Sequence, residues 1–390
     1  MGFISYSEGV NDDVNKFVWS GLGWDPEAEV VDILRQYSRY FIGPEYEDDF
    51  AQGLLALERN WRGPLLANEA VETALRQFQQ MEREASPQTL LNWRFQQGLY
   101  RAYYDAYTRA RLVHETHLEG QALARLRRAK TVGSLAAIEE AEAVLKRANL
   151  DNPAPDWRRR IFQLAEALFQ SIRMQLSVDL YQAISVGRGA NLDTLDVPLN
   201  DRLWLSERFA EIRKMEGEPE RLEAIRAITS WNDPGPGGYY DDLGRVANQP
   251  HLVPGKEYSE DPMFHETPLV GFDCRRGWKR SWCDYIDNLY ESSVSVRYRD
   301  LDPDAAYAVR IVYAGAQSRD GTTIRVRLVA DGDREVHDWI TKPRPIEPVE
   351  FDVPRAATAD GDLTLTCWAE PGRGGPGRGC QIGEVWLVKR

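Results

Sequence analysis

The feature that most constrains this chain is a change in hydrophobic spacing near residue 231. Before that point apolar side chains recur at the three- to four-residue spacing of helices that bury one face. After it, short segments alternate apolar with polar residues and are rich in β-branched side chains, which is typical of strands. The 390 residues are too many for one ordinary core. The sequence therefore predicts a multidomain α + β protein.

The predicted helices are separated by their own stop signals, such as Gly43-Pro44, Gly63-Pro64 and Ser86-Pro87. Their apolar stripes are wide enough for the helices to pack on one another as a bundle. They cover residues 25–42, 45–61, 68–84, 86–128 (one very long helix or two), 134–148, 155–177, 200–215 and 218–229.

The segment 232–270 opens with Asn232-Asp233-Pro234-Gly235 and carries further prolines, so it is predicted to be a long loop or linker. Six predicted strands then suggest an antiparallel, jelly-roll-like β-sandwich. They are residues 292–299, 306–314, 322–330, 349–353, 363–368 and 383–388. The expected domains are 1–24, a helical domain 25–231, the linker 232–270 and a sandwich 271–390.

The first 24 residues are predicted to form a strand followed by a helix. Residues 2–9 read as a short buried strand, and a helix follows with Asp12 or Asp13 as its cap and Gly23 at its end. A strand needs partners, and no second candidate precedes about residue 270. We therefore expect residues 1–24 to be the last strand–helix unit of a (β/α)8 barrel whose other units are missing from this chain. Apolar surface should then be exposed around Phe3, Ile4, Val14, Phe17 and Trp24.

Charge excludes some partners. The net charge of −13 argues against nucleic acid and anionic membranes, which both require a concentrated positive field. The basic runs at 125–130 and 157–160 are interpreted as solvated helix faces. No stretch approaches the roughly 20 apolar residues of a membrane span, and residues 1–20 lack the features of a signal peptide. The compartment stays unknown, because an export signal of a longer protein would precede this sequence.

No metal or cofactor is predicted. His114 and His117 are three residues apart, which does not match the zinc signature HExxH. The four cysteines, Cys274, Cys283, Cys367 and Cys380, form no CxxC pair. One or two disulfides and buried free thiols are equally consistent with the pattern.

Glu8 is the first candidate for chemistry, because barrel enzymes place catalytic carboxylates where a strand ends. The surrounding residues resemble the end of the barrel in large bacterial glycoside hydrolases related to α-glucuronidases and hexosaminidases. The resemblance lies in Tyr6-Ser7-Glu8-Gly9, Asp12-Asp13-Val14-Asn15-Lys16, Gly23-Trp24-Asp25-Pro26 and Tyr37-Ser38-Arg39-Tyr40-Phe41. It covers roughly the first 130 residues, and the C-terminal sandwich is similar in layout to the ancillary domains of such enzymes. It implies that Glu8 contacts sugar, while the catalytic acid lies on barrel strands that this chain does not contain.

Aromatic rings beside carboxylates are the other candidate ligands, because a ring stacks on the apolar face of a sugar. The residues of this kind are Tyr6, Trp24, Tyr239, Tyr240, Asp241, Trp278 and Trp282. Tyr100, Tyr103 and Tyr107 share one helix face, which would reach a substrate only if their rings were exposed. The predicted partner is therefore an oligo- or polysaccharide.

Three functions follow, in order. The first is the C-terminal part of a glycoside hydrolase-like protein that contributes one active-site carboxylate and supporting domains. The second is a non-catalytic carbohydrate-binding or scaffolding protein. The third is an independent enzyme with its site between the helical domain and the linker. The sequence does not specify the sugar, the linkage or the oligomeric state.

Overall fold

The computed structural model describes residues 7, 9–60, 65–244, 250–255, 277–283, 286, 292–314, 325–371 and 380–390. The chain divides into two compact units, each described here by itself. The first comprises residues 1–61, 68–111 and 153–196, and the second comprises 62–67, 112–152 and 197–390. Helix α6 (Trp93–Leu126) contributes residues to both.

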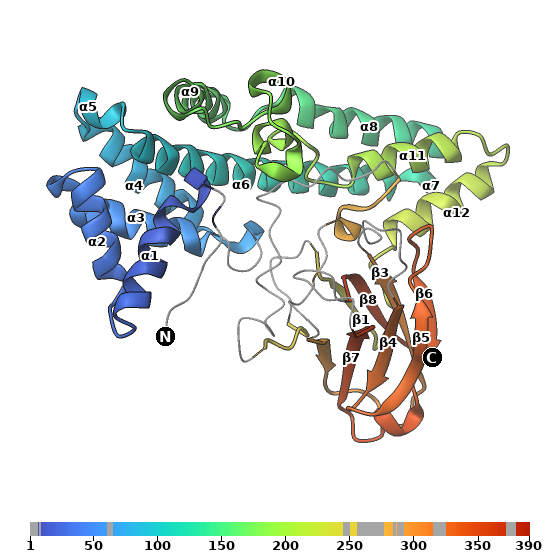
Figure 1. Ribbon diagram of the computed structural model, residues 1–390. Helices are drawn as coiled ribbons and strands as arrows, with labels where there is room; N and C mark the ends of the chain where they lie inside the picture. The colour runs from blue at the N-terminus through green and yellow to red at the C-terminus, as the bar shows by residue number, and fades with distance from the viewer. Residues whose placement is uncertain are drawn as a thin grey trace. The chain divides into compact units, whose positions relative to one another are not determined.

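The first unit is helical. Aromatic side chains of α3, α4 and α6 form part of its core, where the Phe50 ring centroid lies 5.9 Å from that of Phe78 and 6.0 Å from that of Phe95. Gly98 permits this packing, since a Cβ there would lie 2.9 Å from the Phe78 ring. Its helices are α1 (Asp13–Trp24), α2 (Val30–Phe41), α3 (Glu47–Arg59), α4 (Ala70–Glu84), α5 (Pro87–Leu90), the first part of α6, α9 (Pro155–Ile172) and α10 (Val178–Tyr181), with 3-10 turns η1 (Gly9–Asp12), η2 (Pro44–Tyr46), η4 (Val186–Arg188) and η5 (Asn191–Thr194) (Figure 1).

The helices of the second unit form a core of their own. Ile138 and Leu145 of α8 pack with Trp204 and Phe209 of α11 and with Ile225 of α12. The elements are η3 (Leu65–Ala67), the rest of α6, α7 (Ala129–Val132), α8 (Ser134–Leu150), α11 (Arg202–Ile212) and α12 (Glu218–Thr229).

Two four-stranded antiparallel sheets follow in the same unit, with strand orders β1-β8-β3-β6 and β2-β7-β4-β5. Their facing side chains form one buried apolar cluster, as expected for a sandwich. The strands are β1 (Tyr239–Asp242), β2 (Val294–Tyr298), β3 (Tyr307–Tyr313), β4 (Arg325–Ala330), β5 (Arg334–Thr341), β6 (Val349–Asp352), β7 (Leu363–Ala369) and β8 (Ile382–Lys389), with 3-10 turns η8 (Arg280–Trp282) and η9 (Arg355–Ala357).

Strand β8 is buried on both faces. Val385 and Leu387 point into the sandwich core, whereas Trp386 and Val388 belong to a second apolar cluster with Trp282. Because both faces are covered, this strand lacks the clear alternation of a half-exposed strand. The second cluster is where the sandwich meets Trp231, which follows Ser230, the C-cap residue of α12.

The expected helical module followed by a β-sandwich is confirmed, but several details of the prediction are wrong. The segment 232–270 contributes β1, which pairs with β8, so a strand does precede residue 270. Residues 86–128 form α5 and the long α6, and the helix that begins at Pro155 ends at Ile172, where Arg173 takes a left-handed conformation with φ 58°. The sequence does not predict strand β5, because half of its residues are exposed and its burial does not alternate.

The start of α1 also differs from the prediction. Asp12 occupies the N-cap position without a side-chain capping bond. The carboxylate of Asp13 instead accepts hydrogen bonds from the Tyr37 hydroxyl at 2.8 Å and from Arg94 Nε at 2.7 Å. The expected barrel strand at residues 2–9 lies almost wholly outside the described residues, as do Phe3 and Ile4. The expected exposure is confirmed for Trp24 and Phe17, which are 93% and 39% exposed.

The described cysteines include one disulfide-bonded residue and two free thiols. Cys283 is disulfide-bonded, Cys367 and Cys380 are buried free thiols, and Cys274 lies outside the described residues. The basic run 125–130 pairs with acid as expected, since Arg128 Nη1 lies 3.3 Å from Glu140. No helix of the described chain is long and apolar enough to cross a membrane.

The tyrosine face of α6 does not line an open cleft. Tyr100, Tyr103 and Tyr107 are all buried. The Tyr100 hydroxyl donates to Asn191 at 2.8 Å and the Tyr107 hydroxyl donates to Asp196 at 3.0 Å. These hydroxyls are used within the first unit, so the hypothesis that they reach substrate is wrong.

Candidate functional site

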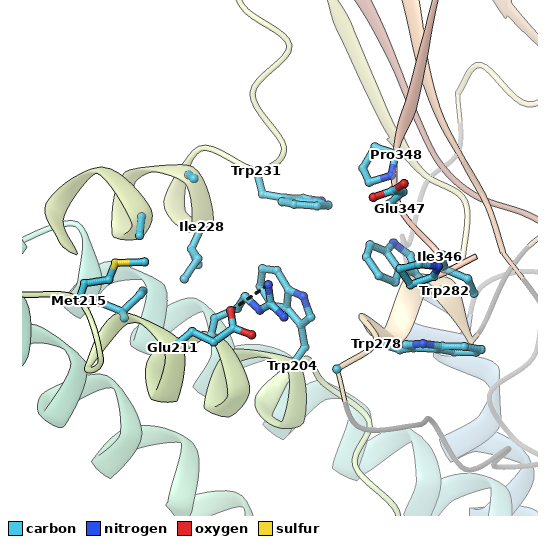
Figure 2. Close-up of a pocket in the computed structure, with 16 residues that line it drawn as sticks. Trp204, Glu211, Met215, Ile228, Trp231, Trp278, Trp282, Ile346, Glu347 and Pro348 are labelled. Atoms are coloured by element: carbon cyan, nitrogen blue, oxygen red, sulfur yellow. Dashed lines mark ion pairs between the residues drawn. The ribbon is translucent and has the colours of Figure 1, made fainter. Parts of the chain in front are cut away.

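A pocket of about 660 Å³ in the second unit collects an unusual number of indole rings. Trp204, Trp231, Trp278 and Trp282 line it, together with the charged side chains of Arg208, Glu211 and Glu347 (Figure 2). The remaining lining residues are Ile212, Met215, Ala224, Ala227, Ile228, Gly277, Pro345, Ile346 and Pro348. Its volume falls in the usual range for small-molecule sites.

These side chains come from four separate segments of the chain. Trp204 lies on the buried stripe of α11 with Leu205 and Phe209, and Trp231 follows the last turn of α12. Trp278 and Trp282 come from the segment 277–283, which includes η8. The segment between β5 and β6 supplies the residues around Ile346.

A buried carboxylate holds two of the rings from behind. Glu384 of β8 is fully buried and accepts hydrogen bonds from Trp231 Nε1 at 2.9 Å and from Trp282 Nε1 at 2.7 Å. It also accepts one from the Tyr240 hydroxyl at 2.6 Å. The Trp386 indole donates in turn to the Trp231 carbonyl at 2.9 Å. Because their N–H groups are engaged, Trp231 and Trp282 present their apolar ring surfaces to the pocket.

A buried ammonium completes this network. Lys279 Nζ lies 2.8 Å from Asp201 Oδ2, and the same carboxylate accepts the backbone N–H of Arg280 at 2.6 Å. The ammonium also lies 4.7 Å from the ring centroid of Trp204 and 5.2 Å from that of Trp231. Burial lowers the pKa of Lys279, but the carboxylates of Asp201 and Glu384 outweigh this effect and raise the pKa above its ordinary value. Lys279 therefore stays charged.

Burial, together with the charges of Asp242 and Glu384, raises the pKa of Tyr240, so this phenol remains protonated and keeps donating to Glu384. Tyr240 supports the pocket from behind and does not line it.

The rim carries an ion pair and a further carboxylate. Arg208 Nη1 lies 3.1 Å from Glu211 Oε2, and both side chains are partly exposed. Glu347 is exposed, and no described residue forms a hydrogen bond or ion pair with its carboxylate. Figure 2 shows Glu211 and Glu347 on the two sides of the ring cluster.

The predicted site residues have different positions. Trp278 and Trp282 line the pocket, and Tyr240 lies behind it. Trp24 is exposed at the end of α1. Tyr6 and Glu8 lie outside the described residues.

Tyr239 and Asp241 serve other contacts. The Tyr239 hydroxyl donates to the Arg299 carbonyl at 3.0 Å. The buried Asp241 accepts from the Tyr298 hydroxyl at 2.8 Å and lies 2.7 Å from His251 Nδ1. Neither residue lines the pocket.

Sequence reasoning missed Trp204, Trp231, Glu347 and Glu384. Trp204 and Trp231 belonged to predicted helices or their ends, where a tryptophan is ordinarily a core residue. A carboxylate in an otherwise apolar strand, as in Ile382-Gly383-Glu384-Val385, was an available signal, because a buried charge requires partners. Among the described residues, no group of three His, Cys, Asp or Glu side chains is arranged to hold a metal ion.

Comparisons with known proteins give little. No protein-family model matches the sequence, and no curated protein matches it. Among solved structures, the chain is similar to a family GH115 4-O-methyl-α-glucuronidase with specificity for decorated arabinogalactans, at 8% identity and a TM-score of 0.27. The match covers 95% of this chain and 43% of that one, so this chain spans less than half the length of that structure. A likeness at this TM-score supports no inference about function.

Proposed function

We propose that this chain binds carbohydrate in the tryptophan pocket and is a supporting part of a glycoside hydrolase-like protein. The observation that carries the proposal is the grouping of Trp204, Trp231, Trp278 and Trp282 around one pocket with carboxylates at its rim. Indole faces stack on the C–H faces of sugar rings, and carboxylates accept hydrogen bonds from sugar hydroxyls.

Preorganisation supports the same proposal. Glu384 fixes the indoles of Trp231 and Trp282 before any ligand arrives. Rings that are already oriented lose less conformational entropy on binding, which favours affinity. The resemblance of the N-terminal segment to glycoside hydrolases is consistent with a sugar ligand. In this proposal Glu8 contributes a carboxylate to the active site of the glycoside hydrolase-like protein.

The test compares Trp278→Ala with wild type in binding to a panel of neutral, amino and acidic oligosaccharides by titration calorimetry. Trp368→Ala is the matched control, because Trp368 is a tryptophan of β7 that is 41% exposed and does not line the pocket. Loss of a central aromatic contact costs about 2 kcal/mol or more, so Trp278→Ala should weaken binding by at least about tenfold.

Circular dichroism establishes that both variants are folded. The proposal fails if no oligosaccharide of the panel binds wild type, or if Trp278→Ala and Trp368→Ala bind sugar equally well.

A further inference from the structure

Among the described residues that line the tryptophan pocket, the charges do not balance. Arg208 is paired with Glu211, which leaves Glu347 as the uncompensated charge of this part of the lining. An acidic ligand would be repelled by this carboxylate, and a neutral one would cover it without offering a countercharge. The net charge of −13 for the whole chain also favours the approach of cations.

Two indole rings of this pocket already contact a cation of the protein itself, the ammonium of Lys279. The ammonium of Lys279 lies over Trp204 and Trp231 at 4.7 and 5.2 Å from the centroids. An indole attracts a cation to its electron-rich face more strongly than the other aromatic side chains do. Trp231 and Trp282 each donate their N–H to the carboxylate of Glu384, which draws the ring proton toward a negative charge and makes the ring faces more negative.

We propose that the ligand of this pocket is a sugar that carries a protonated amine, with its ammonium beside Glu347 and against the indole faces. This inference rests on the proposed carbohydrate-binding function and narrows it to amino sugars with a free amine. The indoles stack on the sugar ring, and Glu347 distinguishes the amine from an acetamide or a hydroxyl at the same carbon.

The experiment uses three trisaccharides that share a β-1,4 linkage: glucosamine, N-acetylglucosamine and glucose trimers. Titration calorimetry at about 0.15 M salt, where the long-range attraction of the acidic chain is screened, measures each affinity. Wild type should bind the glucosamine trimer on the order of tenfold more tightly than the other two.

Two variants test the role of Glu347. Glu347→Gln should lower the affinity for the glucosamine trimer to that for the acetylated and glucose trimers, and so abolish the preference for the amine. Glu220→Gln, a matched loss of one exposed carboxylate on α12 outside the pocket, should retain the full preference. Because Glu347 and Glu220 are both exposed, both variants are expected to fold as wild type does, which thermal unfolding measures.

Three other outcomes would each overturn the inference. Equal affinity of wild type for the three trimers overturns the amine inference and leaves the carbohydrate proposal intact. If the affinity for the glucosamine trimer falls equally in Glu347→Gln and Glu220→Gln, the overall charge attracts the ligand. This result also overturns the amine inference. If none of the trimers binds, the inference fails, and the wider oligosaccharide panel decides the proposed function separately.

Discussion

The substitution Glu384→Gln tests the network behind the pocket most directly. The two carboxylate oxygens of Glu384 accept three hydrogen bonds, from two indoles and a phenol, at 2.6 to 2.9 Å. A glutamine side chain has nearly the same shape but only one acceptor oxygen. Its NH2 group must therefore face at least one of the N–H or O–H donors, and one buried donor loses its partner.

The expected cost follows from that count. A hydrogen bond to a charged group contributes about 1.5–3 kcal/mol, and a buried donor without a partner costs about 1–3 kcal/mol. Glu384 also stabilises the charge of Lys279, which would then depend on Asp201. Breaking one member of a buried charge network typically costs about 3–5 kcal/mol, and we expect Glu384→Gln to lower the free energy of unfolding of the second unit by this amount.

Urea unfolding followed by tryptophan fluorescence and circular dichroism measures the effect. Glu335→Gln is the control, because Glu335 forms an exposed pair with Arg327 at 3.4 Å, and its loss should change stability by less than about 0.5 kcal/mol. In the background Trp282→Phe, which lacks the indole N–H, Glu384→Gln should cost at least about 1.5 kcal/mol less than in wild type. A cost of Glu384→Gln below about 1 kcal/mol in wild type, or the same cost in both backgrounds, would refute the reasoning.

Three further predictions concern the second unit. Gly383→Ala should destabilise it by about 2 kcal/mol or more and weaken sugar binding, because a Cβ there would clash with the Ser281 carbonyl oxygen. Gly120→Ala, with no atom within 4 Å of the added Cβ, should instead stabilise α6 by about 0.5–1 kcal/mol in the same urea assay. Burial lowers the pKa of His337 below 6.5, so the unfolded chain takes up this proton first as pH falls. Stability should therefore drop below about pH 6.5, and thermal unfolding between pH 7 and 5 should show a smaller drop for His337→Gln; equal slopes would contradict the assignment. The buried thiols Cys367 and Cys380 should react with a thiol reagent only at the rate of unfolding, and rapid reaction in native buffer would be inconsistent with their burial.

The sequence predicts the local part of this fold well. The helix expected at residues 218–229 is observed as Glu218–Thr229, and the one expected to end at residue 84 ends at Glu84. These limits are set by neighbouring residues, such as Pro219 in the first turn of α12 and Pro87 just beyond α4. Propensity and stop signals suffice when the relevant interactions lie within a few residues.

The prediction fails where distant residues decide. Strand β1 has only four residues, two of them aspartates, and it is a strand because β8 pairs with it. The sequence does not predict the pocket, for the same reason. Trp231 and its partner Glu384 are 153 residues apart, and the spacing of either residue among its neighbours gives no sign of the other. Trp278 and Trp282 are among the predicted ligands because they are aromatic residues near the predicted sandwich.

The position of β8 has a consequence for how the protein is made. This strand lies between β1 and β3, although the ribosome synthesises both of those strands earlier. The first sheet therefore cannot form completely until residues 382–389 have emerged from the ribosome. Until the same point, Trp231 cannot form its hydrogen bond to Glu384. Until then the indoles of Trp231 and Trp282 lack the carboxylate that orients them, and these apolar rings stay accessible to chaperones. The last of the described strands in chain order is thus the one that completes the first sheet and supplies the carboxylate behind the tryptophan pocket.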